Sequence, residues 1–153
     1  PLVAKHYRVD MKRAIYAGHS FGGLFGLHVL LTEPSMFEKY IIGSPSLWFD
    51  RRVAFATERN YARSHSDLRA KVFMAVASYE TLNFSSTNPR YNKTVDMVRD
   101  LQALAHVLES RRYRSLEVQT TIIDDEDHLT VFPAVITRGL KWALPPQLPE
   151  SAD

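Results

Sequence analysis

The chain has 153 residues, of which 45% are hydrophobic and 24% charged, and its net charge is +2. These values are typical of a globular protein and give no reason to expect binding to nucleic acid or to a membrane surface. The absence of cysteine excludes disulfides and thiolate metal sites. We expect one soluble domain over residues 1–144, followed by a Pro-rich, frayed tail at 145–153, in the cytoplasm or the periplasm.

The first half of the chain alternates between helical and strand-like patterns. Residues 2–6 resemble the last turn of a helix, and the apolar residues of 13–17 predict a strand. A helix is expected over 24–31, with a proline shortly after it. The run Tyr40-Ile41-Ile42 predicts a buried strand, and 51–64 is weakly helical.

The second half continues the same alternation. The continuous apolar run at 72–77 predicts a buried parallel strand, and 83–92 is a polar loop. Leucine and methionine at helical spacing predict a helix over 94–110. A strand at 116–123 and a helix at 131–144 complete the series. The order β-α-β-α-β-α-β-α predicts a mostly parallel α/β sheet with helices on both faces.

A Gly-x-Ser-x-Gly motif lies between the first strand and its helix, at Gly18-His19-Ser20-Phe21-Gly22. In a nucleophile elbow, the serine occupies a strained turn so that its hydroxyl projects from the sheet. Gly18 and Gly22 would leave room for the helix to pass close to the strand. The alternative is a glycine-rich turn in which Ser20 caps the helix.

Three residues that carry catalytic chemistry each follow a different predicted strand. Ser20, Glu80 and His128 lie just beyond the carboxyl ends of these strands, where ligands bind in parallel sheets. Their order along the chain is that of a hydrolase triad. We predict Ser20 as nucleophile, His128 as general base and Glu80 as the acid that orients the imidazole.

Other assignments of the acid remain open. Asp124, Asp125 and Asp127 are close to His128 in sequence, and Asp96 lies in the predicted helix that follows Glu80. His128 itself could be a solvated loop histidine. A metal site made of Asp124, Asp127 and His128 is disfavoured, because no second histidine is near. No metal or cofactor is expected.

Further residues are expected around the nucleophile. The N–H of Phe21 would be one oxyanion donor, and the second normally comes from a loop after an earlier strand. Ser46 and Trp48 follow the second strand and could line the substrate pocket, although Trp48 could equally belong to the core. His19 is expected to line the site or to pack against a neighbour.

The motifs together resemble one branch of the α/β-hydrolases. The segments Gly18–Leu24 and Gly43–Trp48, with Asp127-His128, are similar to the putative-esterase branch, which includes enterochelin (ferric siderophore) esterases and trilactone hydrolases. The similarity extends from about Tyr7 to Trp142. It implies a serine carboxylic-ester hydrolase that acts on a small-molecule ester, with Ser20 as nucleophile and His128 as base.

The chain departs from this family pattern at its beginning. The family fold has several strands and the second oxyanion donor before the elbow, so we expect the C-terminal part of an α/β-hydrolase fold. An open sheet edge of this kind would favour self-association. Two other functions remain open: a non-catalytic, hydrolase-like binding module, and an acyltransferase of the same fold.

Overall fold

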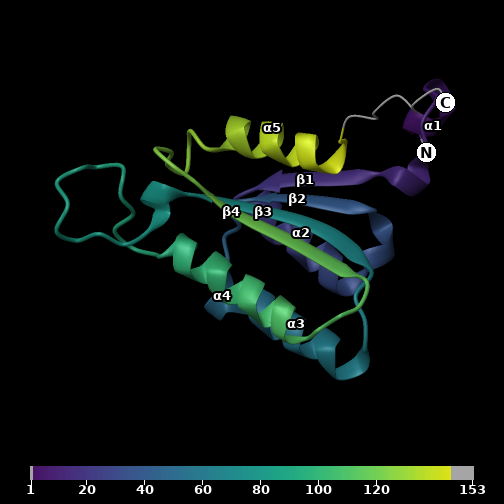
Figure 1. The fold of residues 1–153 in the computed structure, drawn as a ribbon, viewed down its shortest axis with the longest axis horizontal. Coiled ribbons are helices and arrows are strands. Elements are labelled where there is room, and N and C mark those ends of the chain that lie inside the picture. Colours follow the sequence, from purple (N-terminus) through teal and green to yellow (C-terminus); the bar gives the residue numbers. More distant parts are fainter. Residues whose placement is uncertain (1, 146–153) are drawn as a thin grey trace, which may run out of the picture.

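The computed structural model describes residues 2–145, and in this part of the chain four parallel strands form one sheet (Figure 1). The strands are β1 (Ile15–His19), β2 (Lys39–Gly43), β3 (Ala70–Ala77) and β4 (Leu116–Ile123), and they lie in chain order. The carboxyl ends of parallel strands lie at one edge of a sheet, so residues that follow β1, β3 and β4 meet there. Most of the expected tail, residues 146–153, lies outside the described residues.

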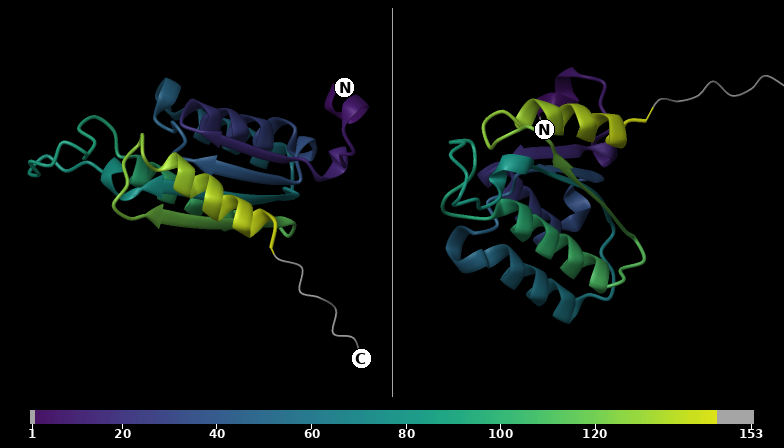
Figure 2. Two further views of the ribbon diagram at one scale, coloured as in Figure 1. Left: turned by 90° about the horizontal axis from the view of Figure 1, so that it is seen from above. Right: turned by 60° about the vertical axis from the view of Figure 1, so that its left-hand side comes forward.

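Helices cover both faces of the sheet, as expected from the sequence (Figure 2). The connecting helices α2 (Phe21–Thr32), α3 (Phe49–Ser64) and α4 (Met97–Ser110) pack on one face, and α5 (Phe132–Ala143) packs on the other. Each new strand is added on the same side of the previous one, so right-handed crossovers place all the connecting helices on the same face of the sheet. Helix α5 follows β4 and does not connect two of these strands, so it can pack on the opposite face.

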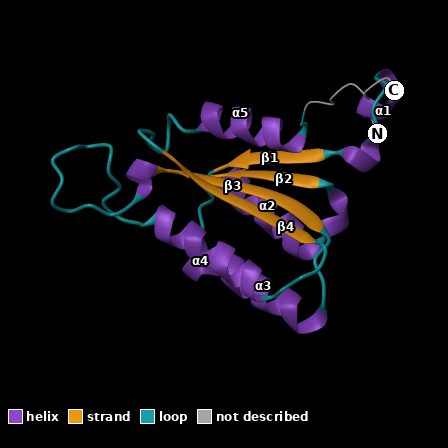
Figure 3. Cartoon of the chain, in the orientation of Figure 1, coloured by secondary structure: helices purple, strands orange, loops and turns teal. Residues whose placement is uncertain are grey.

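Short elements fill the connections (Figure 3). They are α1 and three 3-10 turns: α1 (Leu2–His6), η1 (Met11–Arg13), η2 (Pro34–Met36) and η3 (Ser78–Glu80). The polar loop after η3 extends beyond the carboxyl ends of the strands (Figure 1). None of the described helices is both long and apolar enough to cross a membrane.

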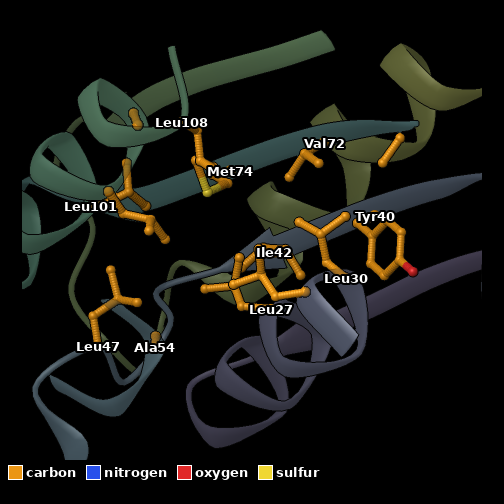
Figure 4. Close-up of a cluster of buried hydrophobic side chains, with 14 of the residues drawn as sticks. Leu27, Leu30, Tyr40, Ile42, Leu47, Ala54, Val72, Met74, Leu101 and Leu108 are labelled. Atoms are coloured by element: carbon orange, nitrogen blue, oxygen red, sulfur yellow. The ribbon is translucent and has the colours of Figure 1, made fainter. Parts of the chain in front are cut away.

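The alternation of side chains along β2 divides the core into two clusters. Tyr40 and Ile42 lie in the larger cluster with residues of α2, α3 and α4 (Figure 4), whereas Ile41 lies in the smaller cluster under α5. All three side chains are fully buried. A strand covered on both faces needs apolar residues at successive positions, which explains the continuous apolar runs in β2 and β3.

The predicted elements are confirmed, with shifts at their ends. The first strand begins at Ile15 and continues to His19, two residues beyond the expected end. Helix α4 begins at Met97 rather than at residue 94, because the side chain of Asp96 accepts a hydrogen bond from the Arg99 N–H at 2.9 Å and caps the helix.

Candidate active site

Ser20 occupies a strained turn between β1 and α2. Its φ of 57° and ψ of −119° lie in a region that residues other than glycine rarely adopt. The turn is held by backbone hydrogen bonds: the Ser20 N–H donates to the Gly43 carbonyl at 2.9 Å, and the Ser20 carbonyl accepts from Ser46 N–H at 3.1 Å. The Ser20 side chain makes no capping hydrogen bond, so the helix-cap alternative is wrong.

The glycines of the elbow differ in how much space a side chain would have at each position. A Cβ on Gly18 would lie 2.5 Å from the Gly22 carbonyl oxygen, so this position requires glycine. A Cβ on Gly22 would meet nothing closer than 3.9 Å, and the expectation that Gly22 provides room is therefore wrong. The backbone of Gly22 approaches Gly18, while its own Cβ position points elsewhere. Gly23 is packed more closely than Gly22, because a Cβ added there would lie 2.9 Å from the Gly43 carbonyl oxygen.

Ser20, His128 and Glu80 form a continuous chain of hydrogen bonds. The Nε2 of His128 lies 2.9 Å from the Oγ of Ser20, and its Nδ1 lies 2.5 Å from the Oε1 of Glu80. Because a carboxylate only accepts, Nδ1 carries the proton and Nε2 is free to accept from the serine hydroxyl. The fold thus brings together residues that lie 108 and 48 positions apart in the sequence.

The carboxylate of Glu80 is buried, and both of its oxygens accept hydrogen bonds. Only 2% of the residue is exposed, and its Oε2 accepts from the Ser44 hydroxyl at 2.5 Å and from the Ala77 N–H at 2.8 Å. These bonds compensate for the loss of water around a buried charge. We did not single out Ser44 from the sequence. Its position in the turn after β2, beside the strand that leads to Glu80, was the only available signal.

The environment of His128 favours its charged form. The hydrogen bond that the His128 Nδ1–H donates to Glu80 raises the pKa of His128 above its ordinary value of 6.5, against the lowering effect of burial. The charges of Glu80 and Asp127 act in the same direction. A base that gains stability on protonation is suited to accept the proton of a nucleophilic serine.

The other acidic candidates face different partners. Asp127 accepts from the N–H groups of Leu129 and Thr130 through Oδ1, and from Arg90 through Oδ2 at 2.9 Å. Arg90 also binds Asp125, and Asp96 caps α4. Within residues 2–145, no group of three or more His, Asp or Glu side chains could hold a metal ion.

The remaining predicted residues surround Ser20. The Ser46 Oγ lies 3.3 Å from the Ser20 Oγ, and Phe21 begins α2, where backbone N–H groups lack intrahelical acceptors. Trp48 is 40% exposed and its ring lies 5.9 Å from that of Phe21, so its assignment to the core is wrong. His19 contacts the backbone of His128.

A cavity of about 360 Å³ opens beside the triad. It is bounded by residues of the loops after β3 and β4: Tyr79, Arg90, Asn92, Asp127, His128 and Leu129. Arg90 closes one side, with its guanidinium 4.3 Å from the Tyr79 ring and paired to Asp125 and Asp127. We did not predict the contribution of Tyr79 and Arg90 from the sequence, because only the path of the loops brings these residues close to His128.

The parallel sheet, the strained serine after β1 and the helices on both faces define the α/β-hydrolase class of fold. Residues 1–121 match the family described as "Putative esterase", and the chain belongs to this family. The matched range includes Ser20 and Glu80 and ends before His128.

Known proteins resemble the chain over nearly all of its length. The ferri-bacillibactin esterase BesA of Bacillus subtilis is 30% identical over 151 residues, which are 97% of this chain and 49% of BesA. The structure of the BES protein from Bacillus cereus is similar with a TM-score of 0.73 and 25% identity, over 94% of this chain and 50% of that protein. Siderophore hydrolase EstB from Aspergillus nidulans gives a TM-score of 0.72 and 26% identity, over 98% and 58%. The chain therefore spans about half the length of these relatives.

Proposed function

We propose that this chain carries the triad of a serine carboxylic-ester hydrolase, with Ser20 as nucleophile, His128 as general base and Glu80 as the acid. The observation that carries the proposal is the hydrogen-bond chain from the Ser20 Oγ through His128 to the buried Glu80 carboxylate, with distances of 2.9 and 2.5 Å. Membership of the esterase family supports the same activity.

In the first half of the reaction, the Ser20 Oγ attacks the ester carbonyl while its proton moves to the His128 Nε2. The negative charge that develops on the carbonyl oxygen is stabilised by the Phe21 N–H, and the imidazolium by Glu80. When the tetrahedral intermediate collapses, the C–O bond breaks and His128 gives its proton to the leaving alcohol. The acyl group remains on Ser20 as an ester.

Water completes the cycle. His128 takes a proton from the water, whose oxygen attacks the acyl carbon, and then returns that proton to Ser20 as the carboxylic acid leaves. An acyltransferase would use an alcohol or amine in place of water at this step.

We further propose siderophore-type lactone esters as substrates. The names of BesA and EstB, an esterase of ferri-bacillibactin and a siderophore hydrolase, support this class. The surface beside Ser20 is also suited to a bulky aromatic ester. Phe21, Trp48 and Phe49 are all partly exposed there and contact one another edge to face.

The proposal is tested by covalent labelling of the natural protein. A fluorophosphonate should modify Ser20, as mapped by mass spectrometry, and Ser20→Ala should lower kcat by a factor on the order of 10⁶. Ser85→Ala, at an exposed loop serine, is the control and should leave labelling unchanged. Labelling of another serine, or of none in the folded protein, would contradict the proposal.

The substrate class and the type of reaction need a second measurement. A panel of a trilactone, a simple aryl ester and a thioester, each with and without an added alcohol, separates the alternatives. Faster turnover of the trilactone supports the siderophore class. Product ester in place of free acid would identify an acyltransferase.

A further inference from the structure

His19, the last residue of β1, directs its imidazole toward the loop that carries His128. Its Nε2 lies 2.9 Å from the backbone carbonyl oxygen of His128. A carbonyl only accepts hydrogen bonds, so the proton of neutral His19 resides on Nε2. The contact joins two residues that are 109 positions apart and connects the elbow strand directly to the loop of His128.

The His19 ring is enclosed by three elements. Its centroid lies 4.7 Å from that of His128 and 5.4 Å from that of Phe132 on α5. On the side of β2, a Cβ at Gly43 would come within 3.1 Å of the His19 Nδ1, so the glycine makes room for the ring. Nδ1 is buried and has no hydrogen-bond partner within residues 2–145. Within the described residues, the hydrogen bond of the neutral ring is the one to His128.

The surroundings keep His19 neutral. Burial lowers its pKa below 6.5, and the positive charge of a protonated His128 lowers it further. The hydrogen bond to the His128 backbone, the charge of Glu80 and the backbone of Gly43 act in the opposite direction but are weaker. The two adjacent histidines thus differ in charge preference, since His128 donates a hydrogen bond directly to Glu80, whereas burial has the largest effect on His19.

We propose that His19 is a positioning residue, whose Nε2–H holds the His128 carbonyl and thereby fixes the His128 imidazole between Ser20 and Glu80. The proposal rests on the function proposed for that triad. Because His19 immediately precedes Ser20, one strand end sets the position of both the nucleophile and the base.

Three substitutions in the natural protein separate this role from simple packing. In His19→Gln, the side-chain amide nitrogen is as many bonds from Cα as the histidine Nε2, so the donor is retained. His19→Asn places its amide one bond short, and His19→Leu has no donor. We expect kcat to fall about 10- to 100-fold in the Leu and Asn variants with little change in KM, because misplacement of a catalytic group by about 1 Å costs roughly that much. His19→Gln should stay close to wild type.

A second readout does not depend on turnover. The proton on His128 Nδ1, bonded to Glu80, should give a far-downfield ¹H NMR resonance, assigned by its loss in Glu80→Gln. It should persist in His19→Gln and broaden or disappear in His19→Leu and His19→Asn. His106→Leu, at an exposed histidine of α4, is the matched control and should change neither readout.

Two results would overturn the proposal. A His19→Leu variant with wild-type kcat and an unchanged downfield resonance would show that the hydrogen bond is not needed. A raised KM with kcat preserved would instead place His19 in substrate binding. If wild-type protein hydrolyses no ester, the proposed function fails, while the resonance still reports whether His19 positions His128. If His19→Leu does not fold, the comparison of Gln with Asn decides.

Discussion

At the scale of single residues, the neighbours of His128 determine how it can act. Glu80 reaches Nδ1 with a buried carboxylate that Ser44 and the Ala77 N–H hold in place. Asp127 is adjacent in the chain, but its carboxylate accepts hydrogen bonds from Arg90 and from the N–H groups of Leu129 and Thr130. The two carboxylates therefore have different expected effects on catalysis.

Glu80→Gln should lower kcat by about 10⁴ or less, since the acid orients the imidazole and stabilises its cation but takes no part in bond making. Asp127→Asn should cost much less, because an asparagine oxygen can still accept from the N–H groups of Leu129 and Thr130. Steady-state kinetics of both variants, with circular dichroism as the control for folding, measures the difference. Near wild-type rates for Glu80→Gln beside a strongly impaired Asp127→Asn would show that Glu80 is not the acid.

The raised pKa of His128 predicts a pH dependence. Only neutral His128 can accept the Ser20 proton, so kcat/KM should fall as pH drops through the pKa of His128, which lies above 6.5 because of the Glu80 hydrogen bond. In Glu80→Gln, this midpoint should move to lower pH, since the carboxylate no longer stabilises the imidazolium. Profiles of kcat/KM against pH for both proteins test the shift, and an unchanged midpoint would argue against the contact.

At the scale of elements, the glycines of α2 control how closely the helix packs on the sheet. A Cβ on Gly26 would lie 2.3 Å from the Tyr16 ring and 2.6 Å from the Ile42 side chain. Both neighbours belong to packed strands, so they have little freedom to move away. The close packing of α2 on the sheet therefore requires glycine at this position, although glycine weakens an isolated helix.

Gly26→Ala should destabilise the fold by about 1–3 kcal/mol, because overpacking outweighs the gain in helix propensity. Gly22→Ala is the matched control on the same helix, since its Cβ would have ordinary contacts, the nearest at 3.9 Å. Urea denaturation should show a lower midpoint for Gly26→Ala and little change for Gly22→Ala. Equal loss of stability in both variants would mean that close approach is not the cause.

At the scale of the whole molecule, the sheet formed by the described residues has two edge strands, β1 and β4. Within the described residues, β1 pairs only with β2, and Ala17 in its middle is exposed. Unpaired N–H and carbonyl groups along such an edge offer a template for another strand. Self-association of the chain through β1 remains a proposal that can be tested directly.

We expect residues 1–153 expressed alone to associate and to hydrolyse esters more slowly than a longer relative such as BesA. Phe21 is the one oxyanion donor that we propose within the described residues, and a site that lacks a second donor typically loses about 10²–10³ in rate. Light scattering and ester hydrolysis at matched concentrations measure both effects. Ala17→Lys, which puts a charge on the edge strand, should reduce association. A monomer with the activity of BesA would contradict both expectations.

The sequence by itself determined the order of the elements and the position of the elbow. Apolar runs such as 72–77 and the helical spacing of Met97, Leu101, Leu104 and Leu108 are local signals, and all these residues are buried as expected. The Gly-x-Ser-x-Gly motif is equally local. The positions of Ser20, Glu80 and His128 followed from a topological rule, because residues after parallel strands gather at one edge.

The tertiary structure alone decided which side chains touch. Asp127 is next to His128 in sequence but faces Arg90, whereas Glu80, 48 residues away, reaches the imidazole. Ser44 and His19 gained their partners in the same way, through contacts across 36 and 109 positions. The physical reason is that a hydrogen bond depends on distances of about 3 Å. Such distances are set by the packing of whole strands and by the path of each loop, which no short stretch of sequence encodes.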